Sequence, residues 1–134
     1  MPHKTGPREI AQRVYVYGLW LLLADIVVQF FLAGLGVLDS ATFFRAHISN
    51  GFLVQVVALV LVPVGWYGRV PGRTLWLTAS IIGLVVLQSV FLGPYRSGAT
   101  GFVRAFASLH VVNGLLVFWV ALRLLEKSRE LQAR

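Results

Sequence analysis

Four long apolar runs dominate the chain and restrict it to one class of fold. They cover residues 14–38, 44–67, 75–94 and 102–125. Each run is close to the ~20 residues that a helix needs to span ~30 Å of hydrocarbon. Short breaks containing glycine, proline, serine and arginine separate the runs. We therefore predict four transmembrane helices.

The composition supports this prediction. Of 134 residues, 57% are hydrophobic and only 13% are charged, which is too little polar surface to cover a soluble core. All three loops are short, so helices adjacent in sequence should be antiparallel neighbours in space. We predict an all-α integral membrane four-helix bundle that forms one domain over residues 1–134. The lipid bilayer is its first expected partner.

The basic residues determine the expected orientation. The net charge is +7, but the lysines and arginines lie at the ends of apolar runs, so we expect no nucleic-acid binding. Nine basic residues flank one side of the predicted membrane and three flank the other. The positive-inside rule then places both termini in the cytoplasm. The nine are Lys4, Arg8, Arg13, Arg69, Arg73, Arg123, Lys127, Arg129 and Arg134, and the three are Arg45, Arg96 and Arg104.

A short phrase occurs twice, near the starts of the second and fourth runs. It reads HISNG at residues 47–51 and HVVNG at residues 110–114. The first and third runs also share a pattern around Gln29 and Gln88. These echoes predict a duplicated two-helix unit, with a pseudo-twofold axis along the membrane normal.

A histidine within a membrane span is energetically costly, so its presence in both copies indicates a shared ligand. In a ring of four helices, the second and fourth lie on a diagonal, and His47 and His110 can meet near the axis. Two imidazoles in this position suit one porphyrin iron, bound from opposite faces. Because the chain has no cysteine, covalent c-type attachment is excluded and the predicted cofactor is haem b.

Residues near the histidines complete the predicted site. Asn50 and Asn113 lie three positions after the histidines, on the same helical face, and could hydrogen-bond an imidazole, a propionate or a backbone carbonyl. Gly51 and Gly114 lie on that face too and leave room for a flat macrocycle.

Two further pairs extend the predicted site. Arg45 and Arg104 lie just outside the histidines and are expected to pair with haem propionates. Gln29 and Gln88 are placed to face the same cavity, or equally to serve as hydrogen bonds between helices.

Other interpretations of the polar residues remain open at this point. The chain could be a cofactor-free scaffold or accessory subunit whose polar side chains hold the helices together. Asp25, within the first run, could instead serve a small transport or ligand-sensing protein. A zinc or copper site is less favoured, since the sequence has no cysteine and no obvious third donor.

Two resemblances add to this interpretation. Residues 28–36 (VQFFLAGLG) and 109–116 (LHVVNGLL) are similar to those of an uncharacterised family of small prokaryotic four-helix membrane proteins. This resemblance implies a multi-pass protein of the prokaryotic plasma membrane. The arrangement of two helix pairs resembles the haem-binding halves of haem A synthase and, more loosely, the di-histidine transmembrane b-type cytochromes.

The second resemblance implies bis-histidine ligation by His47 and His110. Each half of haem A synthase has paired histidines, whereas this chain has one transmembrane histidine per half. We therefore expect this chain to share the bis-histidine ligation of haem, and we do not expect it to synthesise haem A. Iron with two axial histidines has no open position, so we expect an electron carrier near the outer leaflet rather than an enzyme. Its expected partners are a quinone or a membrane redox protein, and a homo-oligomer is left open.

Overall fold

The computed structural model describes residues 6–132, and all regular structure among them is helical. Within these residues, four segments are long and apolar enough to cross a membrane, as expected for the predicted all-α, four-helix membrane protein. The elements are α1 (Pro7–Leu38), α2 (Phe43–Tyr67), α3 (Gly72–Phe91), the short α4 (Gly93–Arg96) and α5 (Gly101–Ala105), the 3₁₀ turn η1 (Phe106–Ser108), and α6 (Leu109–Gln132).

The helix ends differ from the predicted limits in several places. The last helix shows the largest difference, because α6 runs from Leu109 to Gln132 and the predicted range was 102–125. Helix α1 begins at Pro7, well before residue 14, because proline is well accommodated in the first helical turn. The third span ends at Phe91, and Pro94 lies in the first turn of the separate α4. The orientation prediction rests partly on Lys4 and Arg134, which lie outside the described residues.

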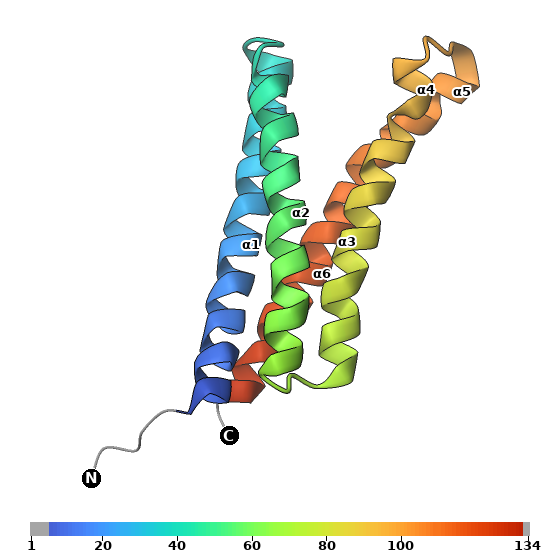
Figure 1. The fold of residues 1–134 in the computed structure, drawn as a ribbon. Coiled ribbons are helices and arrows are strands. Elements are labelled where there is room, and N and C mark those ends of the chain that lie inside the picture. The colour runs from blue at the N-terminus through green and yellow to red at the C-terminus, as the bar shows by residue number, and fades with distance from the viewer. Residues whose placement is uncertain (1–5, 133–134) are drawn as a thin grey trace.

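The long helices form two hairpins, α1–α2 and α3–α6. They pack in a closed ring in which α1 contacts α2, α2 contacts α3, α3 contacts α6, and α6 contacts α1. The hairpins lie together near the start of α1 and the end of α6, and they diverge toward the α1–α2 loop and the α4–α5 segment (Figure 1). We call these the closed end and the splayed end.

The buried core lies mainly in the half of the bundle toward the closed end. Tyr15 on α1 is fully buried, and its hydroxyl lies 2.7 Å from Oγ1 of Thr78 on α3, so a hydrogen bond links the two hairpins. Gly65 permits this close packing, because a Cβ there would lie 2.9 Å from the Tyr15 ring. Core residues from each long helix include Leu19, Leu22, Ala58, Leu61, Ile81, Val117, Ala121 and Leu124.

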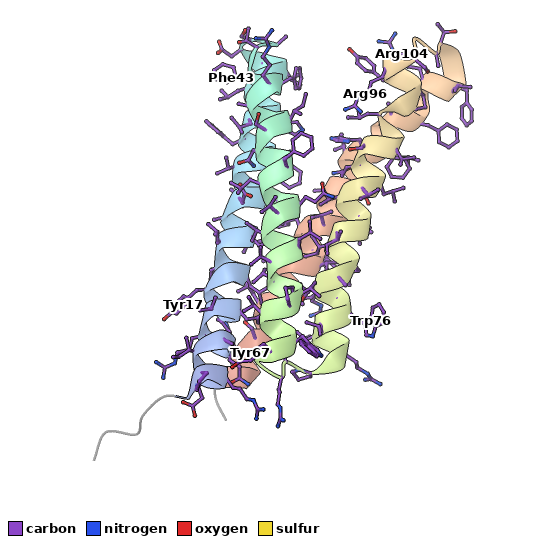
Figure 2. The ribbon with its side chains drawn as sticks, in the orientation of Figure 1. Tyr17, Phe43, Tyr67, Trp76, Arg96 and Arg104 are labelled. Atoms are coloured by element: carbon purple, nitrogen blue, oxygen red, sulfur yellow. The ribbon has the colours of Figure 1, made fainter. Side chains whose placement is uncertain are left out.

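Outside the core, large apolar side chains face outward, as expected where helices contact lipid. Tyr17, Tyr67 and Trp76 are exposed in the half of the bundle at the closed end, while Arg96 and Arg104 lie at the splayed end (Figure 2). Tyrosine and tryptophan favour the level of the lipid headgroups. The exposed surface therefore fits a membrane protein.

Candidate functional site

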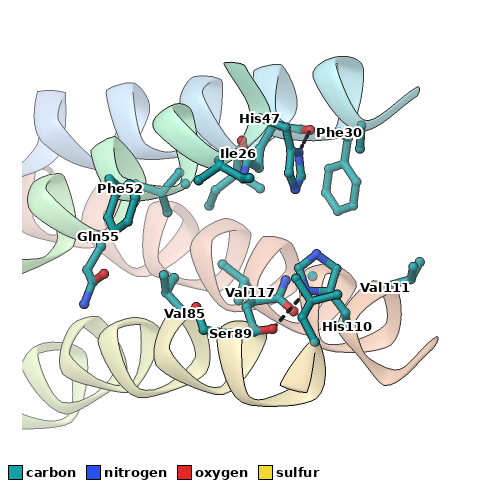
Figure 3. A pocket seen from close by; sticks show the side chains of 18 of the residues that line it. Ile26, Phe30, His47, Phe52, Gln55, Val85, Ser89, His110, Val111 and Val117 are labelled. Carbon is teal, nitrogen blue, oxygen red and sulfur yellow. Dashed lines mark hydrogen bonds between the residues drawn. The ribbon is translucent and has the colours of Figure 1, made fainter. Parts of the chain in front are cut away.

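A cavity of about 290 Å³ lies between the two hairpins, on the splayed side of the core. All four long helices contribute to its wall, which is largely apolar. Its polar lining residues include Gln29, His47, Gln55, Gln88, Ser89, Arg96 and His110 (Figure 3). Ligand pockets are typically about 300–1,000 Å³, so this cavity is near the lower end of that range.

His47 and His110 face one another across this cavity. His47 extends from α2 and His110 from α6, and Figure 3 shows both rings directed into the space between the hairpins. The ring centroids are 6.1 Å apart, and the ring planes are inclined by 56°. The structure thus brings together two residues that lie 63 positions apart in sequence.

Each histidine is fixed within its own hairpin by the same kind of contact. Nδ1 of His47 lies 3.1 Å from the backbone carbonyl oxygen of Gln29, and Nδ1 of His110 lies 3.0 Å from that of Gln88. Because a carbonyl oxygen only accepts, Nδ1 carries the proton and donates it. In the neutral ring the lone pair is therefore on Nε2, which has no hydrogen-bond partner among the described residues of either hairpin.

This donor set suits a metal held between the rings. An imidazole nitrogen binds a first-row metal at about 2.0–2.1 Å, and the ring centre lies about 1.1 Å behind it, so two trans imidazoles have centres about 6 Å apart. The observed separation of 6.1 Å agrees with that value. Metal-ligating histidines also commonly donate their other ring N–H to a carbonyl, as both rings do here.

A third protein donor does not accompany the pair. Within the part of the chain that the structure describes, no group of three or more histidine, aspartate or glutamate residues could hold a metal. An iron bound by His47 and His110 would take its other four ligands from a porphyrin, so the donor set fits haem better than a bare ion.

The two asparagines bind backbone carbonyls and do not line the cavity. Nδ2 of Asn50 donates to the carbonyl of Asp25 at 3.0 Å and to Oε1 of Gln29 at 3.0 Å. Nδ2 of Asn113 donates to the carbonyl of Leu84 at 2.8 Å. Of the three roles predicted for these asparagines, the contact with a backbone carbonyl is the one the structure shows.

Gly51 and Gly114 line the cavity, and they also make room for the glutamines. A Cβ at Gly51 would lie 2.9 Å from Nε2 of Gln29, and a Cβ at Gly114 would lie 3.1 Å from Nε2 of Gln88. The glycines were predicted to admit a macrocycle. Their contacts show that they admit the glutamine amides beside the histidines.

The arginines are arranged differently from the prediction. Neither Arg45 nor Arg104 lines the cavity, and the guanidinium of Arg104 lies 5.2 Å from the centre of the Tyr95 ring. Arg96, at the end of α4, lines the cavity instead. Sequence reasoning missed Arg96 because it treated the segment after the third span as a loop, without the helical turn that carries this arginine.

Two buried oxygens near the site lack a hydrogen-bond partner among the described residues. They are Oδ2 of Asp25 and Oε1 of Gln88. Asp25 is only 7% exposed, although it is a carboxylic acid on an apolar helix. Gln88 is itself one of the residues that line the cavity, whereas Asp25 is not.

Comparison with known proteins gives a match to one family model over part of the chain, and that family has no known function. Residues 29–93, just under half of the chain, match the model of a family of unknown function, DUF6220. The matched segment contains Gln29, His47 and Gln88 and ends before His110. No curated protein and no solved structure matches the chain.

Proposed function

We propose that this protein binds one b-type haem between His47 and His110 and carries electrons in the membrane. The observation that carries the proposal is the pair of rings facing across the gap between the hairpins, 6.1 Å apart, with each Nδ1 bonded to its own hairpin. These hydrogen bonds leave both Nε2 atoms available to the same iron.

The surroundings of the rings support a haem rather than a more polar ligand. Apolar residues such as Phe30, Phe52 and Val85 form much of the cavity wall and would exclude water from the macrocycle. Arg96 adds a cation to that wall and would pair with a propionate by a charge-assisted hydrogen bond. The donor set, the apolar wall and the cation thus match the three parts of a haem.

The chemistry follows from the ligation. A bound haem supplies one-electron transfer at its iron. His47 and His110 would both hold the iron, and two protein ligands on one haem favour electron transfer over binding of a substrate at the metal. The fitting partners are a membrane quinone or a membrane redox protein.

We further infer that the two hairpins arose by duplication of a helix pair. His47 and His110 bond the corresponding glutamine carbonyls, and Asn50 and Asn113 bond the carbonyl four residues earlier. The basic flanks support cytoplasmic termini. The resemblance to small prokaryotic membrane proteins supports the prokaryotic plasma membrane as the location.

A cofactor-free scaffold is the second candidate function. The same side chains hydrogen-bond helix to helix within each hairpin, as polar residues do in many membrane proteins. Such a role uses Nδ1 and gives no reason for the two rings to approach across the gap. At the splayed end, no side-chain hydrogen bond among residues 6–129 joins one hairpin to the other. A shared iron would provide that connection.

The absorbance spectrum of the protein, purified in detergent from haem-supplemented cells, tests the proposal. We expect a Soret band and a sharp α band on reduction, with one haem per chain. The double variant His47→Ala/His110→Ala should lose both bands. His3→Ala is the matched control, because it removes the chain's third histidine, outside the apolar runs. A colourless wild-type preparation would support the scaffold instead.

A further inference from the structure

Asp25 is the one acidic residue within the apolar part of α1, and the haem proposal leaves it without a role. It lies between Tyr17 and Asp39 in a stretch that has no other titratable side chain. Its Oδ2 is buried and has no hydrogen-bond partner among the residues that the structure describes. A carboxylate in this setting is costly unless a positive charge or a proton compensates it.

Asp25 is connected to the histidine through its own hairpin. Asn50 bonds both the carbonyl of Asp25 and the side chain of Gln29, and the backbone carbonyl of Gln29 bonds Nδ1 of His47. Asp25 and Gln29 are one helical turn apart on α1. The acid therefore lies one turn deeper than the carbonyl that holds the proposed iron ligand.

The second hairpin shows that the fold does not need an acid here. In that hairpin the carbonyl bonded by the asparagine belongs to Leu84, which lies four residues before Gln88 just as Asp25 lies four before Gln29. The hydrogen bond is made to the backbone, so any side chain could serve it. The carboxyl of Asp25 is an addition to the shared arrangement.

No fixed cation is placed to neutralise Asp25 from the neighbouring helices. The titratable groups of α2 are Arg45, His47 and Tyr67. Those of α6 up to residue 129 are His110 near its start and Arg123, Glu126, Lys127 and Arg129 near its end. Helix α3 has none after Arg73, and Arg96 lies beyond its end. The only ion pair found in the described part of the chain joins Arg123 to Glu126, on α6.

We propose that Asp25 couples electron transfer to proton uptake, an inference that rests on the proposed haem. A ferric haem core would be cationic, and the carboxylate of Asp25, which is next in sequence to the cavity-lining Ile26 and one helical turn from Gln29, would stabilise that charge. When one electron from a membrane quinol reduces Fe(III) to Fe(II), that charge would be removed, and Oδ2 of Asp25 would take up the proton that the quinol releases as it loses the electron. When the iron passes the electron to an oxidised membrane redox partner, the O–H bond would break and the proton would leave to water.

A redox titration of the haem-loaded protein at a series of pH values tests this proposal. If one proton is taken up with each electron, the midpoint potential falls as the pH rises, by at most about 59 mV per pH unit. Asp25→Asn should remove this dependence and shift the potential upward at alkaline pH. Asp39→Asn is the matched control, because it removes an exposed carboxylate from the end of the same helix and should keep the wild-type slope.

A second measurement uses the wild-type protein alone, in case Asp25→Asn does not fold. The infrared difference spectrum between reduced and oxidised protein should show a protonated carboxylic acid band that appears on reduction. A bound haem whose potential does not depend on pH, or whose slope is the same in Asp25→Asn, would overturn the coupling and leave the haem proposal intact. A missing Soret band would instead overturn the haem proposal.

Discussion

The two hairpins hold their histidines in the same way but differ one helical turn away. In both, the histidine donates to a glutamine carbonyl and an asparagine donates to the carbonyl four residues earlier. The first hairpin places Asp25 at that earlier position, and the second places Leu84 there. The hydrogen bonds that the hairpins share would orient the proposed iron ligands. The hairpins differ in a buried carboxyl group, which Asp25 has and Leu84 lacks. The contacts of the two proposed iron ligands are therefore symmetric, and their electrostatic environment is not.

The largest expected effect tests the symmetric part. His47→Ala and His110→Ala should each weaken haem binding by at least about 10–100-fold, the range seen when groups that merely support metal ligands are removed. The two losses should be similar, because each ring would supply one ligand to the iron. Haem retained after gel filtration, measured by absorbance, gives the comparison. A variant that keeps wild-type affinity would show that its ring is not a ligand.

Alanine at the two glycines should reveal the first difference between the hairpins. In Gly51→Ala the new Cβ displaces the Gln29 amide and disturbs its bond from Asn50, so we expect a loss of about 1–3 kcal/mol in the free energy of unfolding. Gly114→Ala should cost less, because Gln88 Oε1 has no partner to lose and the contact is longer, 3.1 Å against 2.9 Å. Denaturant titration in detergent measures both values. An equal or reversed cost would contradict this explanation.

The cation at the cavity provides a smaller asymmetry. Arg96 on the second hairpin lines the cavity, whereas Arg45 on the first does not. Since Arg96 is exposed, its pairing with a propionate is worth about 0.5–1 kcal/mol, and Arg96→Gln should speed haem dissociation by about two- to fivefold. Transfer of haem to an excess of apomyoglobin gives the rate. Arg45→Gln is the control and should leave the rate unchanged; a faster rate in that variant would place the propionates elsewhere.

The smallest expected difference concerns the asparagines. Asn50 has two acceptors and Asn113 has one, and a hydrogen bond between membrane helices is worth about 0.6 kcal/mol on average. We therefore expect Asn50→Ala to lower the free energy of unfolding by about 1 kcal/mol and Asn113→Ala by about 0.6 kcal/mol. The same denaturant titration applies. A larger loss in Asn113→Ala would mean that its deeper burial outweighs the number of bonds.

Much of the fold could be predicted from the sequence, because four apolar runs near membrane length leave little choice of architecture. Helix ends were harder to place. The break that forms α4 and α5 depends on Pro94 and on Gly101, which has a positive φ of 59°, and such local turns are not visible in an apolar pattern. The sequence did not predict that the two hairpins diverge at one end of the bundle, because this depends on which side chains pack together in the core.

The candidate site was predicted in part. The repeated phrase identified His47 and His110, and the structure places their ring centroids 6.1 Å apart, with the ring planes inclined by 56°. Sequence spacing could not show that each histidine bonds a glutamine backbone carbonyl, because such contacts depend on the packing of one helix against another. It also could not distinguish Arg96 from Arg104, because the choice is made by a single turn of helix in the connecting segment.

The most direct test of the shared iron is the electron paramagnetic resonance spectrum of the oxidised, haem-loaded wild-type protein. With an imidazole on each face, ferric haem is low-spin, and we expect a low-spin signal that accounts for the bound haem. In His47→Ala or His110→Ala, any haem that remains bound should become high-spin. A high-spin signal in the wild-type protein, or a low-spin signal that survives the loss of either histidine, would contradict ligation of one iron by this pair.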